Sequence, residues 1–168
     1  MSPDEQEALL ESWMNAYQDT ILRLCVLYLN DMALAEDAFQ DTFLKAWRSM
    51  RRFQARDGSS VKTWLTRIAI NTCKDYKRSA WLRHVDTTRA PEDLPPALQP
   101  VTQEQRELFL DVLALPEKYR QVTLLYYYQD MTLEETAQTL GTSRQAVARR
   151  LKKACELLRY QPEGSDEA

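Results

Sequence analysis

The sequence predicts an all-α protein made of two small helical domains joined by a proline-rich linker. Only three of its 168 residues are glycine, and apolar residues recur every three or four positions, a period typical of helices. Four of the seven prolines gather between residues 91 and 100, where that period stops. We therefore expect a first domain at 1–80, a flexible linker at 81–103, a second domain at 104–160 and a disordered tail at 161–168.

The first domain is expected to contain three helices. The first begins at Ser2, where Ser-Pro-Asp-Glu is a favourable helix start, and runs to about Leu29. The second runs from about Met32 to Arg51, and the third occupies residues 60–78. Three helices in about 80 residues can bury one small core, near the lower size limit for independent folding.

The third helix has two unlike faces, and Ser59 or Ser60 can cap its start. Its mainly apolar face, expected to pack on the core, consists of Val61, Trp64, Leu65, Ile68, Thr72 and Tyr76. Its other face, where no residue requires burial, consists of Thr63, Arg67, Asn71, Lys74 and Arg78. Arginine and lysine can contact phosphates and asparagine a base edge, so this face is a candidate nucleic-acid surface. An ordinary solvated basic face is the alternative.

The outer face of the second helix is acidic but includes one leucine. It consists of Asp37, Gln40, Asp41, Leu44 and Arg48. One interpretation is an ordinary solvated face with a stray leucine. The other is a docking surface for a basic partner helix, with Leu44 as its apolar contact.

The second domain begins with a helix near Glu104 that stops at Pro116, and a further helix runs from Pro116 to about Asp130. Residues 132–159 then predict a helix-turn-helix. Thr132 with Glu135, and Thr142 with Gln145, are expected to form capping boxes on either side of a turn at Gly141.

The second helix of this pair is expected to enter a major groove, where arginine and glutamine can make bidentate base contacts. Its exposed side presents Arg144, Gln145, Arg149, Lys152 and Lys153. A merely structural helical pair is the alternative, and which of these residues touch bases stays open.

The net charge of −3 conceals a strong segregation of charge along the chain. Residues 1–44 carry a net charge of −8, whereas residues 45–83 carry +9 and residues 142–159 carry +5. Two basic blocks in an acidic protein indicate local contacts with a polyanion. The overall acidity should weaken non-specific DNA binding by the free protein.

The sequence contains no run of about 18–20 apolar residues for a membrane span and no signal peptide, so a cytoplasmic protein is expected. Cys25, Cys73 and Cys155 are far apart, with only His84 to assist them, which suits reduced thiols better than a metal site. We expect no cofactor, no metal and no catalytic residue.

Three stretches together resemble the extracytoplasmic-function (ECF) sigma factors of bacterial RNA polymerase, in the sigma-70 family. The resemblance extends from about Leu9 to Leu158. AEDAFQDTFLKAW is similar to the family's region 2.2, and TWLTRIAINTCKDYKR is similar to its regions 2.3 and 2.4. LPEKYRQVTLLYYYQDMTLEETAQTLGTSRQAVARRLKKACELL is similar to region 4. The order of the three stretches around a proline-rich linker makes the resemblance specific.

The resemblance implies a role for each surface. Region 2.2 docks on the β′ clamp helices, which implies a core-binding surface of Asp37, Gln40, Asp41 and Leu44. Regions 2.3 and 2.4 capture the melted −10 element, which implies −10 contacts by Thr63, Arg67, Asn71, Lys74 and Arg78. In the family, the position that matches Asn71 lines the pocket for a flipped-out base, and an amide can read the exposed edge of such a base. The helix from Thr142 would read the −35 element, which implies Arg144, Gln145, Arg149, Lys152 and Lys153.

The implied partners are core RNA polymerase (β′ clamp helices and β flap), promoter DNA and an anti-sigma factor, which is often membrane-anchored and could hold the protein at the membrane. The linker would thread toward the polymerase's active-site and RNA-exit channels. The polymerase performs the chemistry, so the resemblance implies no small-molecule substrate.

Two other functions remain as alternatives. A stand-alone helix-turn-helix regulator would explain residues 132–159 but would leave the first domain without a role. A small helical enzyme such as a nuclease would need clustered carboxylates or a histidine with a metal, and the sequence contains neither pattern.

Overall fold

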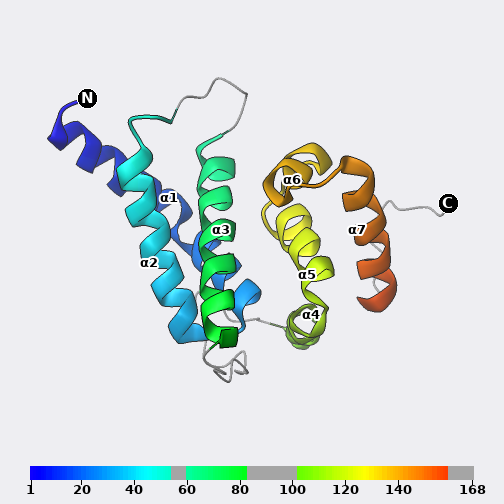
Figure 1. Cartoon of the computed structure of the whole chain (residues 1–168). Coiled ribbons are helices and arrows are strands. Elements are labelled where there is room, and N and C mark those ends of the chain that lie inside the picture. Colours follow the sequence, from blue (N-terminus) through cyan, green and yellow to red (C-terminus); the bar gives the residue numbers. More distant parts are fainter. Residues whose placement is uncertain (54–59, 83–101, 159–168) are drawn as a thin grey trace. The chain divides into compact units, whose positions relative to one another are not determined.

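The computed structural model describes residues 1–53, 60–82 and 102–158, and the described residues are helical with no strand (Figure 1). The all-α prediction is confirmed. The chain divides into two compact units, residues 1–99 and 100–168. The predicted disordered tail and most of the predicted linker lie outside the described residues.

The first unit is a bundle of three helices, α1 (Pro3–Leu29), α2 (Met32–Ser49) and α3 (Val61–Leu82), each packed against the other two (Figure 1). The predicted capping box at Ser2 is present. Helix α3 continues to Leu82, so the predicted linker begins inside this helix. The fully buried large side chains of the bundle are Ile21, Leu24, Leu27, Tyr28, Leu65 and Ile70.

The turn between α1 and α2 is built from two residues. Asn30 ends α1 in the left-handed conformation, with a φ of 52°, which asparagine tolerates better than most residues. The Asp31 carboxylate then accepts a hydrogen bond from the Leu34 amide at 3.0 Å and caps α2. This tight turn sends α2 back along α1 and presents its acidic face to solvent.

The second unit contains α4 (Gln103–Ala114), α5 (Glu117–Thr123), the π-helical segment η4 (Leu124–Tyr128), α6 (Leu133–Leu140) and α7 (Arg144–Leu158). Its core cluster of buried residues comprises Val122, Ala137, Val147 and Leu151. The Thr132–Glu135 capping box is present, and Gly141 ends α6 with a φ of 68°. This is the predicted helix-turn-helix.

The π-helical segment is a difference from the prediction of one continuous helix from Pro116 to Asp130. The Gln129 amide bonds to the Leu124 carbonyl at 3.0 Å, five residues back instead of four. The wider turn buries Leu124 and Leu125 completely while Tyr126 packs against the core cluster. Periodicity at 3.6 residues cannot reveal such a local change of pitch.

In the described parts of the chain, no helix is long and apolar enough to cross a membrane.

Candidate nucleic-acid interface

Helix α3 presents the predicted amide and basic side chains along one side. Asn71 and Arg78 are exposed, and Arg67 and Lys74 are half-buried. Their spacing of four, three and four residues places them on one helical stripe. The structure therefore brings four of the five predicted −10 residues together on one strip of about three turns.

Thr63, the fifth predicted −10 residue, continues the same spacing but is buried. It is only 6% exposed, although the helical spacing predicts that it shares a face where no residue requires burial. Its amide donates a hydrogen bond to the Ser60 hydroxyl at 3.2 Å, which identifies Ser60 as the helix cap. A short hydroxyl side chain next to the cap can turn inward, which periodicity alone does not forbid.

The buried face of α3 is also displaced from the predicted stripe. Val61, Trp64, Ile68 and Tyr76 are not fully buried, whereas the fully buried positions are Leu65, Thr66, Ala69, Ile70, Thr72 and Cys73. Ala69 and Cys73 are small, so they allow close approach of the neighbouring helices. The aromatic side chains Trp64 and Tyr76 are only partly buried.

The predicted docking surface on α2 consists of Asp37, Gln40, Asp41 and Leu44. Asp37 and Gln40 are exposed, Leu44 is 44% exposed, and Asp41 is half-buried. Leu44 is thus an exposed apolar side chain among polar ones, as the predicted docking surface requires.

Tyr76 of α3 reaches this surface, which the sequence pattern does not predict. Its hydroxyl donates a hydrogen bond to Asp41 Oδ2 at 2.5 Å. Burial, followed by this hydrogen bond and the charges of Asp41 and Asp37, raises the pKa of Tyr76 to about 12. A tyrosine near the end of an apolar stripe gives no sign in sequence of a polar partner.

A second polar contact joins α2 to α3. Lys45 Nζ donates to the Thr72 hydroxyl at 3.0 Å, and that hydroxyl in turn donates to the Ile68 carbonyl at 2.8 Å. Helices α2 and α3 are therefore connected by two side-chain hydrogen bonds, Tyr76–Asp41 and Lys45–Thr72.

Helix α7 presents its predicted DNA-reading side chains to solvent. Arg144, Gln145, Arg149, Lys152 and Lys153 are all exposed, whereas Val147, Leu151 and Ala154 are buried. Lys153 lies 3.8 Å from Glu156, but both side chains are more than half exposed, so this pair contributes little. The exposed face is available for phosphate and base-edge contacts.

The cap of α7 differs from the predicted one. The Ser143 hydroxyl accepts a hydrogen bond from the Ala146 amide at 3.0 Å, so the predicted Thr142–Gln145 capping box is wrong. The turn after α6 is one residue longer than predicted. Gly141 adopts the left-handed conformation, and the Thr142 amide donates a hydrogen bond to the Ala137 carbonyl at 3.0 Å, so Thr142 belongs to the turn. Gln145 is thereby released from the predicted capping role.

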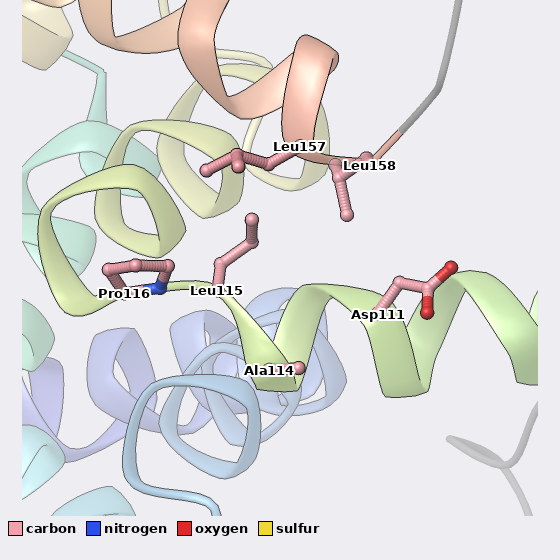
Figure 2. A pocket seen from close by; sticks show the side chains of 6 residues that line it. All are labelled: Asp111, Ala114, Leu115, Pro116, Leu157 and Leu158. Atoms are coloured by element: carbon pink, nitrogen blue, oxygen red, sulfur yellow. The ribbon is translucent and has the colours of Figure 1, made fainter.

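The second unit also carries an apolar groove between the ends of α4 and α7, which the sequence pattern does not reveal. The hollow has a volume of about 460 Å³ and is lined by Asp111, Ala114, Leu115, Pro116, Leu157 and Leu158. Leu115 points toward Leu157 across it (Figure 2). Leu157 is 47% exposed. The sequence gives no sign of this groove, because Leu157 and Leu158 read as ordinary core residues at the end of a helix.

No group of three or more His, Cys, Asp or Glu side chains that could hold a metal occurs within the described residues. Cys25 and Cys73 are buried as free thiols, and Cys155 is half-buried. A hydrogen bond with Cys25, followed by burial, raises the pKa of Cys73, which keeps that thiol protonated.

Comparison with known families identifies both halves of the chain. Residues 13–83 match Sigma-70 region 2, and residues 113–160 match Sigma-70 region 4. The first match contains the surfaces on α2 and α3, and the second contains the helix-turn-helix.

The chain is also similar to curated proteins that are named as RNA polymerase sigma factors. The chain is 32% identical to the probable RNA polymerase sigma factor RfaY of Xanthomonas campestris pv. campestris, over 84% of this chain but only 37% of that protein's length. It is 31% identical to the RNA polymerase sigma-E factor of Streptomyces avermitilis, over 93% of this chain and 86% of that protein. It is 29% identical to the ECF RNA polymerase sigma factor SigM of Bacillus subtilis, over 76% of this chain and 78% of that protein.

Among solved structures, the fold is similar to that of the sigma factor RpoE of Bartonella quintana, solved in complex with the anti-sigma factor NepR. The TM-score is 0.73 at 20% identity, over 89% of this chain and 95% of that one.

Proposed function

This chain belongs to the ECF sigma factors of the sigma-70 family, and on that premise we propose which of its surfaces bind polymerase and which bind promoter DNA. Members of this family are transcription initiation factors that direct RNA polymerase to promoters. We propose that residues 1–80 form the domain for core binding and −10 recognition, and residues 104–160 the domain for −35 recognition.

The core-binding surface in this proposal is the acidic face of α2. Asp37 and Gln40 offer exposed polar groups, and Leu44 offers an apolar contact at their side. An acidic surface with one apolar residue is complementary to a basic amphipathic helix, as the polymerase β′ clamp helices would provide. The proposal is supported by the combination of the exposed Leu44 with acidic and amide side chains on the same face of α2.

The −10 surface is the stripe of Arg67, Asn71, Lys74 and Arg78 on α3. Asparagine can hydrogen-bond the edge of an unstacked base, and the three cations flank it along the helix to hold the strand's phosphates. Thr63 is buried in the free protein, so its proposed −10 role is weaker than that of the four exposed or half-buried residues of the stripe.

The −35 surface is the exposed side of α7. Its first turn is free to enter a major groove, because Ser143 and not Gln145 supplies the cap. Arg144 and Gln145 are then the candidates for base contact, whereas Arg149, Lys152 and Lys153 lie farther along the helix, where phosphate contacts are expected.

We assign the groove between α4 and α7, which is lined by apolar side chains and by Asp111, to the β flap of the polymerase. The groove lies at the carboxyl end of α7, whereas the −35 surface begins at the amino end of the same helix. Both partners can therefore be bound at once. Leu157 lines this groove and is exposed, so it is the side chain through which the assignment can be tested.

We further propose that an anti-sigma factor holds this chain inactive in the cytoplasm. If that partner is anchored in the membrane, the complex lies at the membrane surface. The structure of RpoE, which has a similar fold, was determined in complex with an anti-sigma factor. This similarity supports the proposal of such a partner for this chain. In this function the chain supplies no catalytic residue, since the polymerase joins the nucleotides.

The observation that carries the proposal is the presence, on one chain, of an acidic docking face, an amide-bearing basic stripe and a helix-turn-helix. Run-off transcription with bacterial core polymerase, with and without this protein, on fragments of its own genome tests it. A discrete start site that depends on the protein is the expected result. No such start site, together with tight duplex binding by the free protein at physiological salt, would instead indicate a stand-alone regulator.

A further inference from the structure

Asp41 differs from its neighbours on the docking surface because a residue of another helix holds it in place. Tyr76 of α3 donates its hydroxyl to Asp41 Oδ2 at 2.5 Å. Asp37, Gln40 and Leu44 are more exposed, whereas Asp41 is half-buried. Its carboxylate is thus the member of the surface whose direction is fixed before any partner arrives.

The group that holds Asp41 is neutral. With a pKa raised to about 12, the Tyr76 hydroxyl keeps its proton at physiological pH. Within the described residues, no cation forms an ion pair with Asp41, although Lys45 lies one turn farther along the same helix and bonds to Thr72 instead. The contact therefore orients the carboxylate without neutralising its charge, whereas a lysine or arginine in the place of Tyr76 would neutralise it.

A charge that is oriented and still unpaired is suited to a partner's cation. A side chain already fixed in its bound conformation loses less conformational freedom on association than a mobile one. Oδ2 is engaged by Tyr76, so the other carboxylate oxygen remains for the partner. Leu44, three residues later on the same face, can pack on the apolar stem of the partner's lysine or arginine.

We propose that Tyr76 is a positioning residue for polymerase docking, which holds the Asp41 carboxylate toward an arginine or lysine of the partner helix. The inference rests on the proposed core-binding role of α2. It adds a residue that lies on α3, outside the predicted docking surface, and within the segment otherwise assigned to promoter DNA.

The test is a double-mutant cycle on the affinity of the full-length protein for core polymerase, measured with the wild type, Tyr76→Phe, Asp41→Asn and the double variant. Phenylalanine keeps the ring and removes only the hydroxyl. We expect Tyr76→Phe to weaken binding about fivefold when Asp41 is present and less than about twofold in the Asp41→Asn background.

A purely structural role for Tyr76 would weaken binding by the same factor in both backgrounds, and that result would overturn the proposal. An unchanged affinity of Tyr76→Phe in the presence of Asp41 would overturn it as well. Tyr17→Phe, at a half-buried tyrosine of α1 in the same unit, is the matched control and should leave the affinity unchanged.

The same measurements separate this inference from the proposed function. A loss of affinity in Asp41→Asn without any effect of Tyr76→Phe removes the positioning role and leaves the docking surface intact. If instead Asp41→Asn leaves the affinity unchanged while run-off transcription succeeds, the sigma function stands and both the docking surface and Tyr76's role are wrong.

Discussion

The Arg120 guanidinium donates a hydrogen bond to the Leu113 carbonyl at 3.0 Å and closes the carboxyl end of α4. Arg120 lies on α5 and is 8% exposed, so this bond holds the turn that carries Leu115 and Pro116 into the apolar groove. A charged side chain is seldom this buried without a partner, and here the partners are main-chain carbonyls at the end of a helix, where a cation is favourable.

Replacing Arg120 with methionine should destabilise the second unit by about 1–3 kcal/mol, because the carbonyl that Arg120 satisfies would lose its partner in a buried position. Thermal or urea unfolding measures the change. Arg149→Met, at an exposed position, is the matched control and should shift stability by less than about 0.5 kcal/mol. Equal stability of the two variants would show that the hydrogen bond of Arg120 does not contribute to the free energy of unfolding.

Asp41→Lys should weaken binding to core polymerase by roughly tenfold or more, because a cation would then face the basic partner helix and the bond to Tyr76 would be lost. Helicity by circular dichroism should be retained. Asp19→Lys makes the same change of charge at an exposed position of α1 and should bind core as the wild type does. A similar loss in both variants would point to net charge instead of the α2 surface.

Asn71→Ala should impair promoter melting more than it impairs −35 binding. Asn71 lies on α3, which we assign to the single-stranded −10 element, whereas the −35 duplex is assigned to α7. Permanganate reactivity of the −10 region reports melting, and duplex affinity reports −35 binding. Arg149→Ala provides the reciprocal case, with weaker duplex binding and a shallower salt dependence. Reduced duplex affinity of Asn71→Ala with normal melting would reverse the two roles.

Much of this architecture could be predicted from sequence because it depends on local chemistry. The caps at Ser2 and Thr132 and the turn at Gly141 each follow from a residue's own preferences. Contacts between helices do not follow in this way. The Tyr76–Asp41 bond joins residues 35 positions apart, and periodicity treats that tyrosine as a core residue.

The differences from the predicted local structure have the same origin. Thr142 and Ser143 are both good caps, and only the path of the turn after Gly141 decides between them. Thr63 lies beside the cap of α3, where a small hydroxyl side chain can turn inward. The apolar groove needs the ends of α4 and α7 to meet, which no single segment reveals.

Leu157→Asp should reduce core polymerase affinity or promoter use by several-fold without lowering stability, because Leu157 is 47% exposed and lines the groove assigned to the β flap. Leu110→Asp is a close control, since Leu110 is 43% exposed on α4 but is not part of the lining. Identical behaviour of the two variants would mean that the groove is not a contact surface.

The pH dependence of stability should report the Tyr76 contact in the free protein. The pKa of Tyr76 is raised from about 10 in the unfolded chain to about 12 in the folded one, first by burial and then by the hydrogen bond to Asp41. A group with a higher pKa in the folded state contributes stability that is fully present below pH 10 and lost as the pH rises through about 12.

Urea unfolding of the wild type and of Tyr76→Phe between pH 9 and about 12 isolates this contribution, because all other groups are common to the two proteins. The wild type should lose stability more steeply than the variant across this range. Parallel curves would mean that the Asp41 carboxylate does not hold the Tyr76 proton in solution, and the positioning role would lose its physical basis.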